Sequence, residues 1–383
     1  MSITRFWLFL PRGQRDVLYN ELTQKVVQKI FPAGSEITKN PLEVSPEDRF
    51  WLIPGQNGPR WLIPQEKKYG LSMFQQWRPY NYTSRIKWKI IYMAYYTGRL
   101  GLIPGVKSIG IAKDSKKAWS HIHWDRESVP IPIIYFGTPC STHKAVAVIV
   151  DSFKMQPSII CKVPLSDLAA KSIKQEYNIL CYLKQNNPGV APIPFFLDRE
   201  SGAAVQEAII GSPLPRTFSG LHWKFLEQLA ISDNATSVFE HSQSLLNLLS
   251  KIDRLESKTK ILLERLLKEC RDSTSLPQIF VHGDFAPWNI KKIDNGSLMA
   301  LDWEMGDPNG LPVYDFFYFF IIQAYLFKDK FNLNRIFKLL PEYSKKYPLL
   351  QILKFTAVSL GFRLSKEEQN TEYLENFLRN INL

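Results

Sequence analysis

The pattern of apolar and polar positions changes character along the chain, and the middle of the sequence is typical of extended structure. Between residues 131 and 163 the β-branched runs IPIIYFG, AVAVIVD and SIICKV are separated by turn-forming residues. This pattern predicts an antiparallel meander. A helix is predicted over about 167–185, with Ile173 and Leu180 on one face. Another strand over about 203–210 would complete a small α+β lobe.

Beyond Gly211 the apolar period becomes helical. Leu and Lys or Glu recur at three- and four-residue spacing around 222–231 and 236–270, which predicts a mainly helical region. One hairpin interrupts it: the turn Asp-Asn-Gly lies between the alternating segments 289–293 and 297–303. An Asn-Gly pair in this position is a strong hairpin signal.

The first 130 residues are rich in Trp, Pro and basic residues. The repeated tetrapeptide WLIP, at 51–54 and 61–64, predicts two short extended segments joined by a turn. The run SRIKWKIIYMAYYTGR at 84–99 has apolar residues at helical spacing, so a helix is expected there. The sequence therefore predicts three regions: an N-terminal basic and aromatic extension over 1–130, an α+β lobe over 131–210, and a helical lobe over 211–383.

Length and charge refine this division. A chain of 383 residues exceeds the roughly 250–300 at which one core stops growing. The net charge of +12 is unevenly placed: residues 1–130 carry +10, residues 321–383 carry +4, and the middle carries −2. A surface for an anionic partner is therefore expected outside the central region.

The stretch 77–117 concentrates this charge, with nine basic residues and one acid interleaved with Trp and Tyr. Two interpretations stay open. It could lie on an anionic membrane as a peripheral contact. Alternatively, its aromatic face packs on the rest of the protein while the basic stems cover apolar surface. Binding of nucleic acid is not expected.

Cysteine usage and apolar run lengths indicate the compartment. The four cysteines are widely spaced with no CxxC pair, which argues against structural zinc and against a disulfide framework. The opening apolar run is broken by Pro11, so no secretory signal is expected. The longest apolar stretch, 316–327, is too short to span a bilayer. A cytoplasmic protein, soluble or peripheral to the inner face of the membrane, is expected.

The candidate catalytic and metal-binding residues lie at the two ends of the hairpin. The segment VHGDFAPWNI places His282, Asp284 and Asn289 just before it, and ALDWE places Asp302 at its far end. Phosphoryl transfer requires magnesium held by hard oxygen ligands and a carboxylate that orients the attacking hydroxyl. Asn289 and Asp302 suit the metal, and Asp284 suits the catalytic base.

The spacing of these residues agrees with the kinase catalytic pattern, in which Asn follows the catalytic Asp after four intervening residues. HGDFAPWN followed by LDWE, in place of DFG, resembles the aminoglycoside phosphotransferase and choline kinase-like family of the protein-kinase-like superfamily. A protein kinase is disfavoured because the DFG and APE signatures are absent. The resemblance implies a bilobal α+β fold with a small antiparallel-sheet N-lobe and a mainly helical C-lobe. It also implies a phosphotransferase that uses an alcohol acceptor, Mg²⁺, and ATP, with GTP as the alternative nucleotide.

Further residues take their roles from this resemblance alone. Lys162 is similar to the lysine that holds the α- and β-phosphates, and Glu176 to its ion-pair partner. Gln206, Glu207 and Ala208 fall where the family's hinge contacts adenine. This region would therefore be the nucleotide-binding lobe.

The resemblance is incomplete around the nucleotide. The turn Gly137-Thr138-Pro139 occupies the place of the nucleotide-covering loop but lacks GxGxxG, so an ordinary hairpin loop is an equal alternative. Asp315 resembles the buried aspartate that braces the catalytic loop, and His282 is expected to brace it too. Glu304 is left outside the site, because a solvated or capping carboxylate is an equally good interpretation.

The acceptor is less defined than the catalytic pattern. Residues 1–130 match nothing in these small-molecule kinases. The aromatic run 316–325 and the basic tail disfavour a polycationic acceptor and favour a sugar hydroxyl on a lipid-linked or anionic saccharide, stacked on aromatic side chains. A catalytically inactive nucleotide-binding regulator or scaffold is the alternative. The atypical glycine loop favours it, and the intact set Asp284, Asn289 and Asp302 argues against it.

Overall fold

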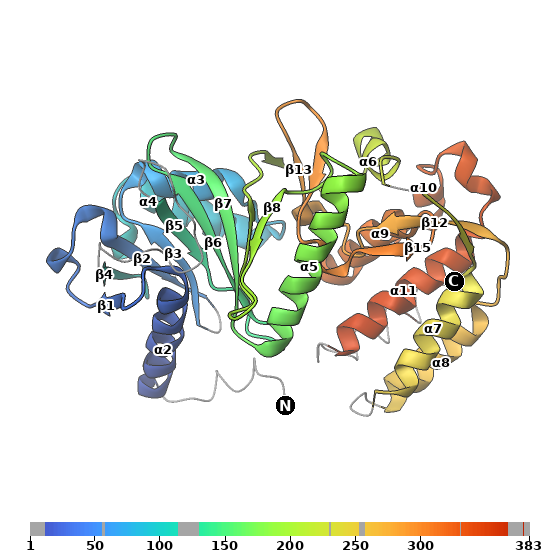
Figure 1. Ribbon diagram of the computed structural model, residues 1–383, viewed down its shortest axis with the longest axis horizontal. Helices are drawn as coiled ribbons and strands as arrows, with labels where there is room; N and C mark the ends of the chain where they lie inside the picture. Colours follow the sequence, from blue (N-terminus) through green and yellow to red (C-terminus); the bar gives the residue numbers. More distant parts are fainter. Residues whose placement is uncertain are drawn as a thin grey trace. The chain divides into compact units, whose positions relative to one another are not determined.

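The computed structural model describes residues 12–55, 58–113, 130–229, 231–252, 257–329, 331–366 and 378. The chain divides into two compact units (Figure 1). The first comprises Met1–Gln185, Ala191–Pro213 and Lys291–Met299. The second comprises Asn186–Val190, Leu214–Ile290 and Ala300–Leu383. The opening residues 1–11 and the end of the basic stretch, 114–117, lie outside the described residues.

The first unit is built on a nine-stranded sheet with the order β1-β4-β2-β3-β5-β6-β7-β9-β8, and its paired strands are antiparallel. The strands are β1 (Glu36–Thr38), β2 (Arg49–Pro54), β3 (Pro59–Pro64), β4 (Lys107–Ala112), β5 (Pro130–Tyr135), β6 (Lys144–Asp151), β7 (Gln156–Pro164), β8 (Pro194–Leu197) and β9 (Ala204–Glu207).

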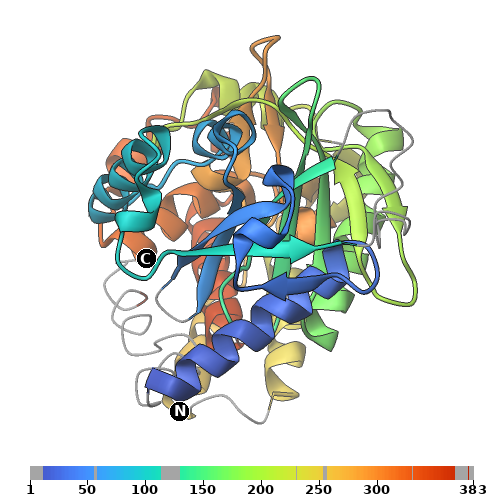
Figure 2. The ribbon, with the colours of Figure 1, turned by 90° about the vertical axis from the view of Figure 1, so that its left-hand side faces the viewer.

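One face of this sheet packs against the helix α2 (Arg12–Ile30). Side chains alternate between the faces of a strand, and the paired residues Leu52 and Leu62 point to the same side. They join Val26 and Ile30 of α2 in one buried apolar cluster. Figure 2 shows α2 running across the strands.

The opposite face is covered by the helices α3 (Lys67–Gln76) and α4 (Tyr82–Tyr96). Ile63 and Ile133 of the strands pack there with Met73 of α3 and Tyr95 of α4. The Tyr95 hydroxyl donates to the carbonyl of Pro64 at 2.8 Å. Burial of a large apolar side chain stabilises by roughly 1.5–3 kcal/mol, so both faces contribute to one layered core.

The sequence predicted most of these elements. The meander of β5, β6 and β7, the helix α5 (Asp167–Asn186), the paired WLIP strands and the helix α4 are confirmed. The sheet is larger than the small one that was expected, because β1–β4 join it through the pairing of β3 with β5. These strands have apolar side chains on both faces, and such segments are stable only inside a covered sheet.

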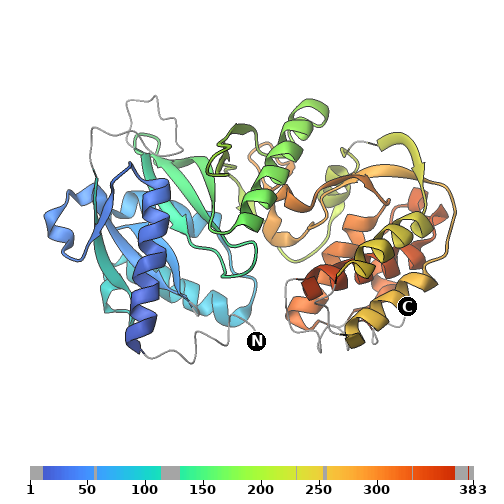
Figure 3. The ribbon, with the colours of Figure 1, turned by 60° about the horizontal axis from the view of Figure 1, so that its bottom comes forward.

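The second unit is mainly helical, as predicted. Its helices are α6 (Gly220–Leu226), α7 (Val238–Ser250), α8 (Ser257–Glu269), α9 (Tyr314–Phe327), α10 (Leu333–Phe337) and α11 (Leu349–Lys366). Figure 3 shows α7, α8 and α11 alongside one another. The predicted helix over 236–270 is divided into α7 and α8. A small sheet of β11 (Ile231–Thr236), β12 (Leu276–Val281) and β15 (Asp307–Gly310) was not predicted.

The hairpin at the centre of the catalytic prediction is confirmed. Its strands are β13 (Ile290–Lys292) and β14 (Leu298–Ala300), which form a three-stranded sheet with β10 (Ser212–Pro213). The Ile293 amide donates to the Ser297 carbonyl at 3.0 Å, and Gly296 has a φ of 84°. Among the described residues no helix is both long enough and apolar enough to cross a membrane.

Candidate active site

The lysine and glutamate expected to form an ion pair do so inside the first unit. Lys162 on β7 points its ammonium to Glu176 on α5, with Nζ at 2.6 Å from each carboxylate oxygen. Both side chains are buried. Glu176 occupies the same face of α5 as the buried Ile173 and Leu180, so a charge interrupts an apolar stripe. Removal of one partner from a buried pair typically costs 3–5 kcal/mol, and the pair is therefore held as a unit.

The loop between β5 and β6, expected to cover the nucleotide, is closed by its own hydrogen bonds. The His143 ring bonds through Nε2 to the Phe136 carbonyl at 2.7 Å, and Arg60 on β3 donates to the Thr138 hydroxyl at 3.0 Å. Gly137 has a φ of 73°, and a Cβ there would lie 2.3 Å from the Lys144 carbonyl. Only glycine fits this turn.

The three residues assigned to the hinge are at the end of β9. Gln206 is buried opposite Ile160 in the sheet. The Glu207 amide donates to Ile193 at 2.8 Å, and the Ala208 amide donates to Ser158 at 3.2 Å. The two backbone amides predicted to donate to adenine therefore already donate to backbone carbonyls of the first unit.

The loop that carries Asp284, predicted to be catalytic, is braced by Asp315 at the start of α9. Its carboxylate accepts the amides of His282 at 2.6 Å and Gly283 at 3.0 Å. Burial raises the pKa of Asp315 to about 7, and these two hydrogen bonds oppose that rise. Gly283 has a φ of 75°, and a Cβ there would lie 2.2 Å from the Met305 carbonyl. The bracing role expected of Asp315 is thus seen directly in its contacts.

His282 links the loop to the far end of the hairpin. Its Nδ1 accepts the Asp284 amide at 3.1 Å, and its Nε2 bonds to the Leu301 carbonyl at 2.9 Å. A carbonyl only accepts hydrogen bonds, so Nε2 carries a proton. Nδ1 accepts from an amide and therefore carries none, which makes the ring neutral. Burial also lowers the pKa of His282, which favours the same neutral form.

The backbone brings the predicted metal ligands into adjacent positions within the second unit. Asn289 donates through Nδ2 to the Asp284 carbonyl at 3.0 Å and to Asp284 Oδ2 at 2.8 Å. The Leu301 amide donates to the Asn289 carbonyl at 2.7 Å, so the next residue, Asp302, follows directly. Asp302 has left-handed torsions, φ 63° and ψ 60°. A non-glycine residue in this conformation is strained and is typical of functional sites.

The donor chemistry of Asn289 and Asp302 fits magnesium. With Nδ2 held by Asp284, the amide oxygen of Asn289 is the atom left for a hard cation, and Asp302 adds a carboxylate. Among the described residues no group of three or more His, Cys, Asp or Glu side chains could hold a metal ion. A site of this composition therefore requires further oxygen ligands, such as phosphate or water.

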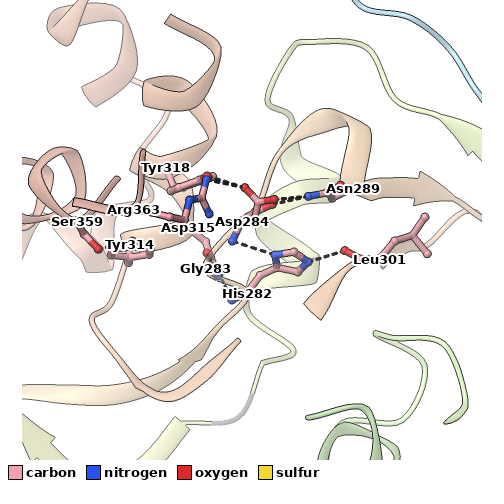
Figure 4. Close-up of polar contacts among 10 residues, drawn as sticks. All are labelled: His282, Gly283, Asp284, Asn289, Leu301, Tyr314, Asp315, Tyr318, Ser359 and Arg363. Atoms are coloured by element: carbon pink, nitrogen blue, oxygen red, sulfur yellow. Dashed lines mark hydrogen bonds and ion pairs between the residues drawn. The ribbon is translucent and has the colours of Figure 1, made fainter. Parts of the chain in front are cut away.

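Two residues beside Asp284 were not predicted (Figure 4). The Tyr318 hydroxyl on α9 donates to Asp284 Oδ1 at 2.5 Å, and Arg363 on α11 donates to the same oxygen at 3.2 Å. Tyr318 lies three residues after Asp315, so helical spacing could have suggested it. Arg363 is 79 residues from Asp284 in the sequence, and no local signal could have identified it.

The aromatic run expected to stack on a sugar has a different role. Phe316, Phe317 and Phe319 of α9 are fully buried, and Tyr325 is 7% exposed. They pack with other core aromatics, among them Phe218. The expectation of a stacking surface here is wrong, because α9 is apolar on nearly all sides and most of its side chains are buried.

Comparison with known proteins adds distant similarities. No family model matches the sequence, and no curated protein does. The choline kinase LicA from Streptococcus pneumoniae is a similar solved structure, with 15% identity and a TM-score of 0.43, over 64% of this chain and 90% of that chain. APH(2")-IIia in complex with GDP and kanamycin has 13% identity and a TM-score of 0.41, over 68% and 92%. A macrolide 2'-phosphotransferase type I has 12% identity and a TM-score of 0.40, over 65% and 93%.

The identities and TM-scores of these solved structures are low.

Proposed function

We propose that this protein is a phosphotransferase that moves the γ-phosphate of ATP to a hydroxyl group of a sugar or saccharide-containing acceptor. The observation that carries the proposal is the arrangement of Asp284: Asn289, Tyr318 and Arg363 hold its carboxylate, and Asp315 and His282 brace its backbone. A carboxylate held this firmly is suited to orient a hydroxyl and accept its proton.

The remaining roles follow from the chemistry of each group. Lys162, positioned by Glu176, binds the phosphates of the nucleotide. Asn289 and Asp302 hold Mg²⁺, which neutralises charge on the phosphates when bound. The segment that binds the adenine is still proposed to include Gln206, Glu207 and Ala208. Because the amides of Glu207 and Ala208 donate elsewhere, the purine is recognised through carbonyls or later residues of this segment.

The acceptor is proposed to be neutral or anionic. The guanidinium of Arg363 lies beside Asp284, where the acceptor hydroxyl must also lie. A cation in this position repels a polycationic acceptor and attracts an acidic saccharide or the headgroup of a glycolipid. Charge therefore takes the place of the aromatic stacking that the sequence suggested as the basis for binding the acceptor.

The test is turnover with a defined panel. Purified protein with Mg²⁺ and ATP is assayed for acceptor-dependent ADP release against neutral saccharides, acidic saccharides, aminoglycosides and amino alcohols. We expect activity with saccharides. Asp284→Asn should lower kcat by about 10²- to 10⁴-fold and leave ATP affinity, measured by calorimetry, nearly unchanged. Asp294→Asn, on the exposed turn of the hairpin, is the matched control.

Two results would contradict the proposal. Equal turnover by wild type and Asp284→Asn would remove the assigned base. Tight nucleotide binding without turnover on any acceptor would favour the inactive regulator or scaffold, for which the hydrogen-bonded β5–β6 loop and the occupied hinge amides are the supporting observations.

A second proposed role is peripheral contact with an anionic membrane. Within the basic stretch 77–117, the segment proposed to make this contact is α4. Tyr82, Ile86, Ile90 and Met93 form an apolar stripe on α4 at spacings of four, four and three residues, and all four are exposed. The opposite face of the helix, with Tyr95, packs on the sheet. Thus α4 has two apolar faces: one packs in the core of the first unit, and the other is exposed.

Charge and shape around this stripe suit an anionic lipid surface. Arg85, Lys87 and Lys89 flank it, and residues 77–113 contain no acidic residue. A cavity of about 330 Å³ between α3 and α4 is lined by Leu71, Phe74, Trp88, Lys89 and Tyr92. An exposed apolar stripe between cations is the arrangement of helices that lie in the membrane interface.

A further inference from the structure

The contacts of Asp284 assign different tasks to its two oxygens. Oδ1 accepts hydrogen bonds from the Tyr318 hydroxyl at 2.5 Å and from Arg363 Nη2 at 3.2 Å. Oδ2 accepts one bond, from Asn289 Nδ2 at 2.8 Å. A carboxylate oxygen accommodates about two donors. Among the described residues Oδ1 is therefore saturated, while Oδ2 has room for one more donor.

The direction of each proton in this cluster is determined by its partners. Arg363 Nη2 also lies within hydrogen-bonding distance of the Tyr318 hydroxyl oxygen, and the guanidinium is centred 5.2 Å from the Tyr318 ring. A guanidinium only donates, so the Tyr318 oxygen accepts from Arg363 and its own proton goes to Asp284. Burial raises the pKa of Tyr318 well above its usual value, and the hydroxyl stays protonated.

We infer that Arg363 and Tyr318 are positioning residues for the proposed phosphotransfer, which occupy Oδ1 of Asp284 and leave Oδ2 as the oxygen that takes the proton of the acceptor hydroxyl. This inference rests on the proposed function. In the step, the acceptor oxygen forms a bond to the γ-phosphorus, the bond from that phosphorus to the ADP oxygen breaks, and the acceptor proton moves to Oδ2.

These contacts affect the orientation of the Asp284 carboxylate as well as the packing around it. Two donors on Oδ1, one of them charged, oppose the rotation that would exchange the two oxygens. The residues come from three separate places, the catalytic loop, α9 and α11, all within the second unit (Figure 4). Asn289 connects the same carboxylate to the proposed metal site, so one side chain links metal binding to the orientation of the base.

The test compares Arg363→Gln, Arg363→Lys and Tyr318→Phe with wild type, using the best acceptor found for the wild-type enzyme. We expect Arg363→Gln to lower kcat by about 10- to 100-fold, with a small effect on the affinity for ATP. The loss should appear in kcat while the KM for a neutral acceptor stays nearly unchanged, because these contacts orient the base and do not bind the acceptor. Arg363→Lys keeps a charged donor near Oδ1 and should recover most of kcat.

Tyr318→Phe separates orientation from charge. It removes the hydroxyl and keeps the ring, so the buried packing of α9 is retained, and kcat should fall by about tenfold or more. Arg265→Gln on the exposed face of α8 and Tyr343→Phe, whose hydroxyl donates to Glu227, are matched controls with unchanged kcat.

The outcomes distinguish this inference from the proposed function. Wild-type protein without turnover on the whole panel overturns the function itself. Active wild type, with Arg363→Gln and Tyr318→Phe both folded and both retaining the wild-type kcat, overturns the inference alone. Equal losses in Arg363→Lys and Arg363→Gln, accompanied by a lower melting temperature and a higher KM for ATP, would show a purely structural role and would also overturn it.

Discussion

At the scale of single residues, burial in the fold shifts the pKa of titratable side chains. His222 at the start of α6 is 1% exposed and accepts the Ser219 amide through Nδ1 at 3.0 Å. Its Nε2 has no hydrogen-bond partner among the described residues. Burial lowers the pKa of His222 to about 4, because a second ring proton would leave a buried charge with no counterion.

The consequence is a pH-dependent loss of stability. The folded-state pKa of His222 is below the unfolded value of 6.5, so the native state binds fewer protons between pH 6.5 and 4. Relative to His222→Gln, wild type should therefore lose about 2 kcal/mol of unfolding free energy between pH 7 and pH 5. Urea unfolding of both proteins at the two pH values measures this. A constant difference between them would contradict it, and pH 8 serves as the control because both forms of His222 are neutral there.

At the scale of elements, amphipathic pattern and observed burial agree for α5 and are more complex for α4. On α5 the stripe Ala169, Ile173, Leu180 and Leu183 is buried, and only Glu176 breaks it. On α4 the sequence offered two interpretations, a packed aromatic face or a membrane surface. The helix has one packed face and one exposed apolar face, because its aromatic residues Trp88 and Tyr95 and its aliphatic residues Ile86 and Ile90 point in different directions.

The membrane role of α4 predicts a specific loss of binding. The full chain should float with phosphatidylserine-containing vesicles at low salt and remain at the bottom with neutral phosphatidylcholine vesicles or at high salt. Ile86→Glu together with Ile90→Glu should reduce the bound fraction by about tenfold or more, since both apolar insertion and attraction are lost. Leu248→Glu, an exposed apolar position on α7, is the matched control.

Vesicle binding that is unchanged in the double variant would exclude α4 as the contact. Absence of flotation by the wild-type chain with anionic vesicles at low salt would exclude the membrane role altogether. Neither result bears on the proposed phosphotransfer, because α4 carries none of the residues proposed for the nucleotide, the metal or the catalytic base.

At the scale of the whole molecule, the first 130 residues belong to the structure that carries Lys162. The pairs Trp61 with Tyr135 and Leu62 with Ile134 join β3 to β5. The same region supplies α2 to one face of the sheet and α3 with α4 to the other. We therefore propose that residues 1–130 and the nucleotide lobe form one domain, although the sequence predicted an extension that packs on the lobes.

This proposal makes truncation a decisive experiment. Removal of residues 1–129 would expose the β5 edge and uncover both apolar faces of the sheet. We expect the truncated chain to be insoluble or to lack a cooperative thermal transition, because an open apolar edge strand aggregates. The full chain is the control, measured by circular dichroism. A soluble truncated chain with a cooperative transition would restore the interpretation as a separate extension.

The local features of the site could be predicted from the sequence because they depend on neighbours along the chain. The Asn-Gly hairpin and the spacing of Asp284 and Asn289 follow from short-range turn and strand geometry. The ion pair of Lys162 with Glu176 was expected only because the sequence resembles a known family. The short strands β11, β12 and β15 were missed, since each is too brief for a clear period and is stabilised only by its partners.

The amino-acid sequence by itself determined the fold class, the order of most elements and the three side chains around the hairpin, because alternation, turn chemistry and motif spacing act over a few residues. The tertiary structure alone decided which apolar runs are core and which are surface. It buried the aromatic run of α9, exposed one face of α4, and placed Arg363 beside Asp284 across 79 residues of sequence. Contacts between distant segments depend on how whole elements pack, and no local pattern encodes them.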